Sequence, residues 1–276
     1  MMFRREVLTL AALATLSGAA FAQAYPNKPI KFVVGSQAGG VVDIIARELA
    51  EAIKPHLGGR AVVVDAKPGA GGRIGVATVK TAQPDGNTVL LTPASIMTLY
   101  PHVFSKLGYD TPKDFVPISP VCMSANALAV GTHVPVKTLG EFLAWCKANP
   151  KEATYASPGA GSAPHFLGAQ IASAAGIEML HVPYKGAPDI LNDLYGGRIA
   201  SFVTALSNAV QPHKAGKMRV LVTTSPKRSA VLPEVQTAAE AGFPQHTSLE
   251  WFGLLAPAGT GPERISALNL AVSQAV

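Results

Sequence analysis

The chain has 276 residues, of which 48% are hydrophobic and 14% are charged, and its formal net charge is +6 at pH 7. This mild excess comes without a basic cluster, so nucleic acid is excluded as an expected partner and a bias toward small anions remains. The apolar fraction can fill one large or two modest domains, and two cysteines, Cys122 and Cys146, are too few for a disulfide scaffold.

Residues 1–22 have the pattern of a secretory signal peptide. Arg4 and Arg5 give a basic start, residues 7–20 are an apolar stretch too short to span a bilayer, and residues 20–22 read Ala-Phe-Ala, a small-x-small cleavage site. We expect cleavage before Gln23 and export of the mature protein. No later stretch reaches the roughly 18 uninterrupted apolar residues of a spanning helix.

The first strand, glycine loop and helix of the mature chain predict half of a ligand site. Residues 30–34 are an apolar run, residues 35–40 read Gly-Ser-Gln-Ala-Gly-Gly, and apolar residues then recur at helical spacing to about His56. A loop between a strand and a helix N-terminus presents backbone N–H groups to an anion. A tight turn that serves only close packing is the alternative.

The segments that follow continue the alternation of strands and helices, which predicts an α/β fold with mostly parallel sheets. Residues 67–72 contain Gly69-Ala70-Gly71, but Ile74 replaces the third glycine of a dinucleotide fingerprint, so no nucleotide is expected. The strand at 88–92 ends at a third loop of small residues, where Ser95 is a candidate wall of the site.

The second half of the chain repeats the opening pattern. Residues 114–130 predict an extended segment that carries the chain into another domain, and a strand at 154–157 then leads into a second loop rich in glycine and serine, Ser157–His165. Two such loops, one in each half, can clamp a small anion. We expect the return crossing at residues 226–230, a short helix at 234–241, a strand at 250–256 and a last helix from Pro262.

Catalytic motifs are missing from the sequence. The seven histidines show no metal-ligand spacing, and neither glycine loop has serine in the place that a nucleophile elbow requires. We therefore expect no metal, no cofactor and no enzymatic activity. A secreted hydrolase that uses Ser36 or Ser162 with His165 remains the alternative, because triads are recognised by geometry.

Two further side chains have expected structural roles. Asp43, in the first turn of its helix, would repel an anionic ligand unless loop N–H groups or Arg47, four residues on, absorb its charge. Cys146 shares a helix face with apolar residues, which favours a buried free thiol over a bridge to Cys122.

The ordered set of motifs resembles one known family, the Bug-type extracytoplasmic solute receptors of tripartite tricarboxylate transporters. The resemblance runs from about Tyr25 to the end of the chain. It is carried by Val34–Arg47, Lys67–Gly72 with Ile74-Gly75, Pro84–Gly86, Ser157–His165, His181–Gly186, Ala215–Lys217, Trp251–Leu254 and Pro257–Thr260.

The resemblance implies a two-domain periplasmic-binding-protein fold of type II, a Venus flytrap with crossing hinge strands. The first domain is expected at 23–124 and 226–276, and the second at 125–225. The implied protein is a periplasmic monomer that closes over a small carboxylate and delivers it to the integral-membrane permease subunits. A ligand sensor for a signalling partner is a further alternative.

Carried over to this sequence, the resemblance places ligand-binding residues in two jaws. Ser36 stands where the family often has an aromatic residue, Val42 replaces a small polar one and Thr204 an acid or small one, so the ligand cannot be copied from a relative. The sequence also ends inside a helix after which family members continue, so we expect a truncated sequence. The expected ligand-binding residues are Ser36, Gln37, Gly39, Gly40, Asp43, Ser95, Ser157, Gly159, Gly161, Ser162, His165, Tyr184, Lys185 and Thr204.

Overall fold

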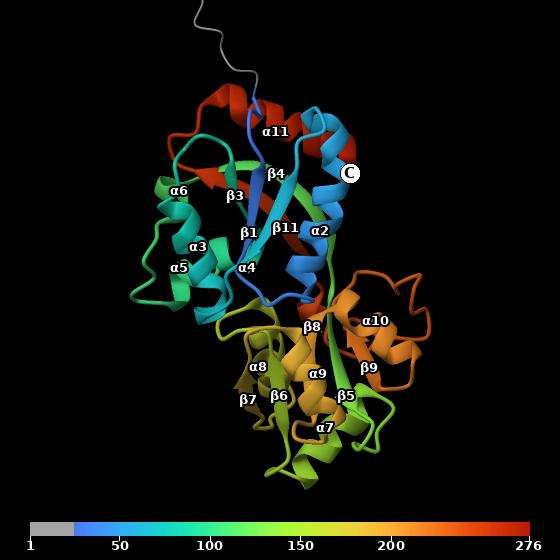
Figure 1. The fold of residues 1–276 in the computed structure, drawn as a ribbon. Helices are drawn as coiled ribbons and strands as arrows, with labels where there is room; N and C mark the ends of the chain where they lie inside the picture. The colour runs from blue at the N-terminus through green and yellow to red at the C-terminus, as the bar shows by residue number, and fades with distance from the viewer. Residues whose placement is uncertain (1–24) are drawn as a thin grey trace, which may run out of the picture.

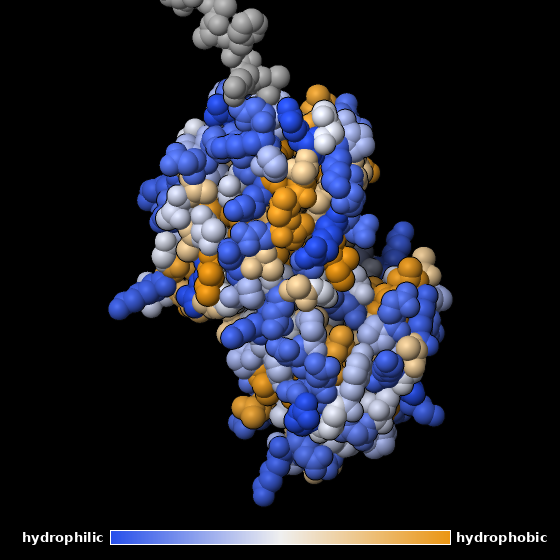
Figure 2. Space-filling model, in the orientation of Figure 1, coloured by the Kyte–Doolittle hydropathy of each residue, from blue (hydrophilic) through white to orange (hydrophobic). Residues whose placement is uncertain are grey.

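The computed structural model describes residues 25–276, which form two α/β lobes that meet at a narrow waist (Figure 1). The predicted signal peptide, residues 1–22, lies outside the described residues. Most of the face shown in Figure 2 is hydrophilic, and the waist between the lobes is visible as an indentation of the surface.

The first lobe is built on a five-stranded sheet of order β2-β1-β3-β11-β4, in which β1, β2 and β3 are parallel and β11 runs antiparallel to both its neighbours. Its strands are β1 Ile30–Val34, β2 Val62–Ala66, β3 Thr88–Pro93, β4 Phe115–Ser124 and β11 Glu250–Pro257. Its helices are α2 Val41–Ile53, α3 Arg73–Lys80, α4 Ala94–Thr98, α5 Tyr100–Val103, α6 Thr111–Asp114 and α11 Pro262–Ala275, with short 3-10 turns η1 Lys54–Leu57 and η2 Ala70–Gly72.

The second lobe is built on a six-stranded sheet of order β10-β9-β5-β8-β6-β7. Its strands are β5 Asn126–Gly131, β6 Thr154–Ser157, β7 Leu180–Pro183, β8 Ser201–Ala205, β9 Met218–Thr223 and β10 Gln236–Thr237. Its helices are α7 Leu139–Ala148, α8 Ala163–Ala174, α9 Ala187–Tyr195 and α10 Leu206–Lys214, with the 3-10 turn η3 Pro244–His246.

The helices cover the sheets because their apolar residues recur at helical spacing. In α2, Ala46, Leu49 and Ile53 are buried against β1 and β3, while Arg47 and Glu51 are exposed. In α7, Cys146 is buried beside Phe142 and both cysteines are free thiols, as expected. Burial raises the pKa of Cys146 to about 11.

The chain crosses between the lobes twice. The first crossing falls at Ala125, between β4 and β5, within the segment predicted to carry it. The second falls at Leu249, between η3 and β11. Thr224 ties the two crossings together, because its hydroxyl accepts a hydrogen bond from Asn126 N at 2.9 Å and donates one to Ser248 O at 2.7 Å.

The prediction of a return crossing at 226–230 and a helix at 234–241 is wrong. Leu232 and Val235 are buried in the core of the second lobe, and residues 236–237 pair with β9 as β10. Residues 226–248 therefore lie with the second lobe, and the first lobe resumes with β11. The error arose because residues 226–241 contain turn-forming residues and too few apolar positions to show a strand period.

Candidate functional site

A cavity of about 80 Å³ lies between the lobes and is lined from both of them. It has room for roughly five to eight water-sized groups. The predicted residues that line it are Ser36, Gly40, Ser95, Gly159, Ser162, Lys185 and Thr204. The predicted residues that do not line it are Gln37, Gly39, Asp43, Ser157, Gly161, His165 and Tyr184, and most of these shape the surrounding loops.

Helix N-termini converge on this cavity. Its lining includes the N-cap residues of α2, α3, α4, α8, α9 and α10, which are Gly40, Gly72, Pro93, Ser162, Gly186 and Ala205. Only Ser162 among them makes a side-chain cap to its own helix. The first N–H groups of α2, α3, α9 and α10 receive no side-chain cap, whereas Ser95 N in the first turn of α4 donates to Glu250 Oε1 at 3.2 Å. The positive ends of these helix dipoles face one small space.

The first glycine loop, residues 35–40, is held from behind by Asp43. The Asp43 carboxylate accepts from Gly39 N at 2.9 Å, from Arg47 Nε at 2.9 Å and from Arg47 Nη2 at 3.1 Å. Burial acts to raise the pKa of Asp43, but the bonds from Arg47 and Gly39 outweigh it and the pKa is lowered. The carboxylate thus holds the loop in place, and Arg47 neutralises its charge, as the spacing of the two residues predicted.

The same loop packs tightly on the next glycine segment. A Cβ added to Gly35 would lie 2.6 Å from Gly72 Cα, so no side chain can be added there without moving the backbone. Ser36 Oγ is buried beside the cavity and has no hydrogen-bond partner among residues 25–276. It is a free hydroxyl donor at this end of the site.

The second glycine loop, residues 158–162, is held by serine and histidine side chains. Ser162 Oγ donates to Gly159 O at 2.7 Å and accepts from His165 N at 3.4 Å, which makes it the N-cap of α8. His165 Nδ1 accepts from Gly161 N at 3.0 Å, so the ring bonds to the loop backbone as an acceptor and not as the donor expected from its place in the first turn of α8. Burial lowers the pKa of His165, so the neutral ring is favoured.

The geometry gives no support to a hydrolase. The ring of His165 stacks on His181 with centroids 3.8 Å apart, and its Nδ1 is used by the loop. The serine that contacts a histidine side chain is Ser157, whose Oγ lies 2.7 Å from His181 Nε2 and which is fully buried. Burial and the neighbouring His165 lower the pKa of His181 to about 4.

The rims of the two lobes touch around the cavity. Gln37 Nε2 donates to Asp189 Oδ2 at 2.8 Å across the cleft. A Cβ added to Gly159 would lie 3.2 Å from Gly71 Cα, and one added to Gly186 would lie 3.0 Å from Gln37 Oε1. These contacts enclose the cavity, so the described arrangement is closed over it.

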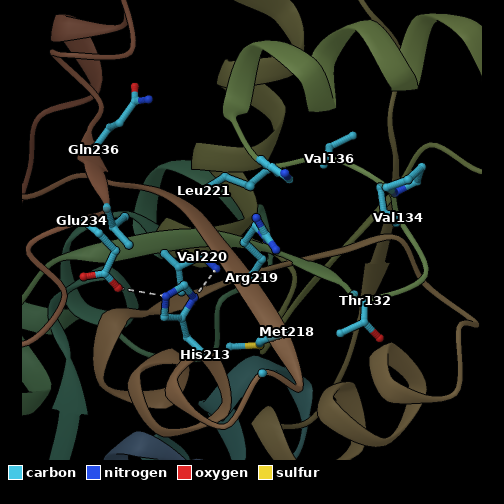
Figure 3. A pocket seen from close by; sticks show the side chains of 15 residues that line it. Thr132, Val134, Val136, His213, Met218, Arg219, Val220, Leu221, Glu234 and Gln236 are labelled. Atoms are coloured by element: carbon cyan, nitrogen blue, oxygen red, sulfur yellow. Dashed lines mark hydrogen bonds and ion pairs between the residues drawn. The ribbon is translucent and has the colours of Figure 1, made fainter.

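A larger depression of about 690 Å³ lies elsewhere, on the second lobe near β9 and β10 (Figure 3). Two of its polar side chains already have partners: His213 Nε2 pairs with Glu234 at 3.0 Å, and His213 Nδ1 accepts from Val220 N at 3.0 Å. It is lined by the second lobe alone, and neither glycine loop reaches it. The cavity between the lobes is therefore the better candidate.

Sequence reasoning missed several residues that line the cavity. Asn126 and Glu250 stand directly after the two crossings, and Asn208 donates to Thr204 Oγ1 at 2.9 Å from the first turn of α10. The signal that was available for Asn126 was a polar residue at the start of an otherwise apolar strand. Glu250 gave no such signal, because its crossing was expected some twenty residues earlier in the chain.

Residues 45–276 match the model of a family described as the tripartite tricarboxylate transporter family receptor. The chain belongs to this family. The receptor is 35% identical to a Pseudomonas sp. (strain P51) protein encoded in the tcbD-tcbE intergenic region, over 99% of this chain and 82% of that protein. The predicted resemblance to Bug-type receptors is confirmed.

Solved structures give the same result. The receptor superposes on the periplasmic binding protein BugD with a TM-score of 0.87 at 34% identity, covering 91% of this chain and 83% of that one. It matches MatC from Rhodopseudomonas palustris with bound malate at a TM-score of 0.86 and 29% identity, covering 91% and 85% of the two chains. A second R. palustris protein, with adipate, matches at a TM-score of 0.86 and 31% identity, covering 90% of this chain and 83% of that one. The predicted two-lobe periplasmic-binding-protein fold is confirmed.

Residues 25–276 contain neither a candidate membrane span nor a candidate metal site. None of the helices in that range is both long and apolar enough to cross a membrane. Within the same range, no group of three or more His, Cys, Asp or Glu side chains is placed to hold a metal ion. The family is one of periplasmic receptors, and its members capture solutes and do not transform them.

Proposed function

We propose that this receptor captures a small carboxylate in the cavity between its lobes and delivers it to the membrane subunits of a tripartite tricarboxylate transporter. The observation that carries the proposal is the convergence of helix N-termini on one cavity. The malate and adipate in the related R. palustris structures are carboxylates, which supports the same class of ligand for this chain.

The energetics favour a carboxylate even though none of the arginines within residues 25–276 lines the cavity. Burying a carboxylate costs several kcal/mol of hydration. Each hydrogen bond to a charged group returns about 1.5–3 kcal/mol, and a partly buried helix N-terminus adds up to about 2 kcal/mol. The N–H of Gly186, the hydroxyl of Ser36 and the uncapped first-turn N–H groups of α2 and α9 can supply such bonds, so three or four of them offset the cost.

Thermal-shift screening followed by titration calorimetry tests the ligand class. A panel of mono-, di- and tricarboxylates is expected to contain ligands that raise the unfolding temperature, and the primary amide of the best ligand serves as the matched uncharged control. NMR spectra of the ligand after incubation should be unchanged, because a receptor does not transform it. Equal binding of acid and amide, or formation of a product, contradicts the proposal.

Delivery requires a second experiment with membrane subunits. When these are reconstituted in vesicles, uptake of the ligand should depend on added receptor and saturate with its concentration. Uptake that proceeds equally well without the receptor contradicts delivery while leaving ligand capture intact.

Export is the remaining part of the proposal. Residues 1–22 are proposed to direct the chain to the periplasm and to be removed there. Mass spectrometry of the protein from a periplasmic extract should find Gln23 at its N-terminus. A chain that retains Arg4 and Arg5 in that extract contradicts cleavage.

A further inference from the structure

The cavity has two chemically different ends. The glycine loops follow β1 and β6, whereas Glu250 and Asn126 begin β11 and β5. In the sheets, β11 lies two strands from β1, and β5 lies two strands from β6. Because neighbouring strands are about 4.8 Å apart, Glu250 and Asn126 stand on strands about 10 Å from those that lead into the glycine loops.

This second end presents acceptors. Glu250 is 9% exposed and its Oε1 accepts from Ser95 N at 3.2 Å. Asn126 is 4% exposed, and its Oδ1 receives no hydrogen bond from any group of residues 25–276. The backbone of Asn126 is fixed at the same time by Thr224, whose N–H donates to Asn126 O and whose hydroxyl accepts from Asn126 N.

Among residues 25–276, no ion pair to Glu250 is formed. Lys185 is the cationic residue that lines the cavity, and it follows β7, which is three strands from β5 in the sheet. Three strand spacings correspond to about 14 Å. Burial raises the pKa of Glu250, against the hydrogen bonds from Ser95 and Asn126, which agrees with a carboxyl group without an ion-pair partner.

We propose that Glu250 and Asn126 form a subsite for a protonated amine, so that the receptor's ligand is a small amino-carboxylate with its charges a few atoms apart. The ligand's carboxylate lies at the glycine loops, and its ammonium donates to the Glu250 carboxylate and to Asn126 Oδ1. An ammonium group has three donors and a positive charge, and so complements both acceptors. This inference rests on the proposed carboxylate-binding function.

The subsite also discriminates against ligands that lack the amine. A second carboxylate at that end would face Glu250, and like charges in a buried site repel strongly. A methyl group there would leave Asn126 Oδ1 buried without a donor and would forgo the ionic bond to Glu250, which is costly. Dicarboxylates and simple alkyl carboxylates of the same length are therefore expected to bind more weakly than the amino-carboxylate.

Calorimetry with ligands of matched length tests the subsite. The probes are β-alanine, γ-aminobutyrate and δ-aminovalerate, and for γ-aminobutyrate the matched controls are valerate, with a methyl in place of the ammonium, and glutarate, with a carboxylate. We expect the best amino-carboxylate to bind the mature protein at least tenfold more tightly than its controls. This comparison uses the unaltered protein and does not depend on whether a variant folds.

Glu250→Gln then identifies the residue responsible. The variant keeps the size of the side chain and removes its negative charge, so the preference for the amine should fall at least tenfold while valerate and glutarate bind as well as before or better. Asn126→Leu should also weaken amine binding, with its thermal unfolding measured to show that the fold is kept. If the amines have no advantage, or if Glu250→Gln preserves it, the subsite is refuted. If no carboxylate of any kind binds, the proposed function itself fails.

Discussion

Replacing Gly159 by valine should weaken ligand binding by hindering closure of the lobes. A Cβ at this position would lie 3.2 Å from Gly71 Cα, which belongs to the opposite lobe. Carbon atoms pack best at about 3.5–4.0 Å, and valine adds two more methyl groups beyond that Cβ. The φ angle of Gly159 is not in the left-handed region, so valine strains the contact between lobes and not the loop itself.

The magnitude follows from the cost of overpacking. Extra methyl groups in a close contact cost about 1–3 kcal/mol, and here that cost falls on the closed form alone. A difference of that size between two states corresponds to about 5–150-fold in binding. We therefore expect the Kd to rise within this range while the unfolding temperature of the ligand-free protein stays unchanged.

Calorimetry measures the affinity, and small-angle scattering measures closure. The ligand that binds most tightly in the carboxylate panel should reduce the radius of gyration of the unaltered receptor and fail to do so for Gly159→Val. Gly140→Val is the matched control, because Gly140 lies in α7 and a Cβ there meets nothing within 4 Å. Unchanged affinity of Gly159→Val would refute the reasoning. So would a fall in ligand-free stability that the control does not show, since valine would then disturb the loop itself.

Other predictions concern the loops and the thiols. Asp43→Asn should lower the free energy of unfolding by about 1.5 kcal/mol at pH 7, the low end for a lost charge-assisted bond because the Arg47 side chain is 58% exposed. Since the pKa of Asp43 is lowered in the folded protein, this contribution is present above its unfolded pKa and lost as the pH falls through the folded pKa, so urea titrations of the two proteins should converge in acid. Ser162→Ala should cost about 1 kcal/mol by removing the N-cap of α8, and an unchanged urea midpoint would contradict that role. A thiol reagent should label the exposed Cys122 in the native protein and reach the buried Cys146 after denaturation, whereas two fast thiols in the native protein would contradict the burial.

The repeated local patterns could be predicted from the sequence. Strand, glycine loop and helix follow one another within some twenty residues at β1–α2 and at β6–α8, so period and turn chemistry specify them directly. The pairing of Asp43 with Arg47 is local in the same sense, because residues four apart meet on a helix. Such features depend on contacts between near neighbours in sequence.

What escaped prediction depends on contacts between distant segments. β10 is two residues long and is a strand only because β9 lies beside it. Asn126 and Glu250 share a cavity although 124 positions separate them in the sequence. The two crossings bring the first residues of β5 and β11, which belong to different sheets, to the cleft between the lobes. Glu250 could not be predicted as a cavity residue, because its place in the cleft depends on where the chain crosses back to the first lobe, and that crossing was expected near residue 226.

Ala125 and Leu249, the linking residues between the lobes, each directly precede a side chain that faces the cavity, and Thr224 fastens both links. The hinge axis between the lobes therefore passes beside the groups that determine ligand selectivity. A substitution there changes both the ligand selectivity and the free energy of lobe closure. Redesigning the receptor for a new ligand therefore has to adjust both properties together.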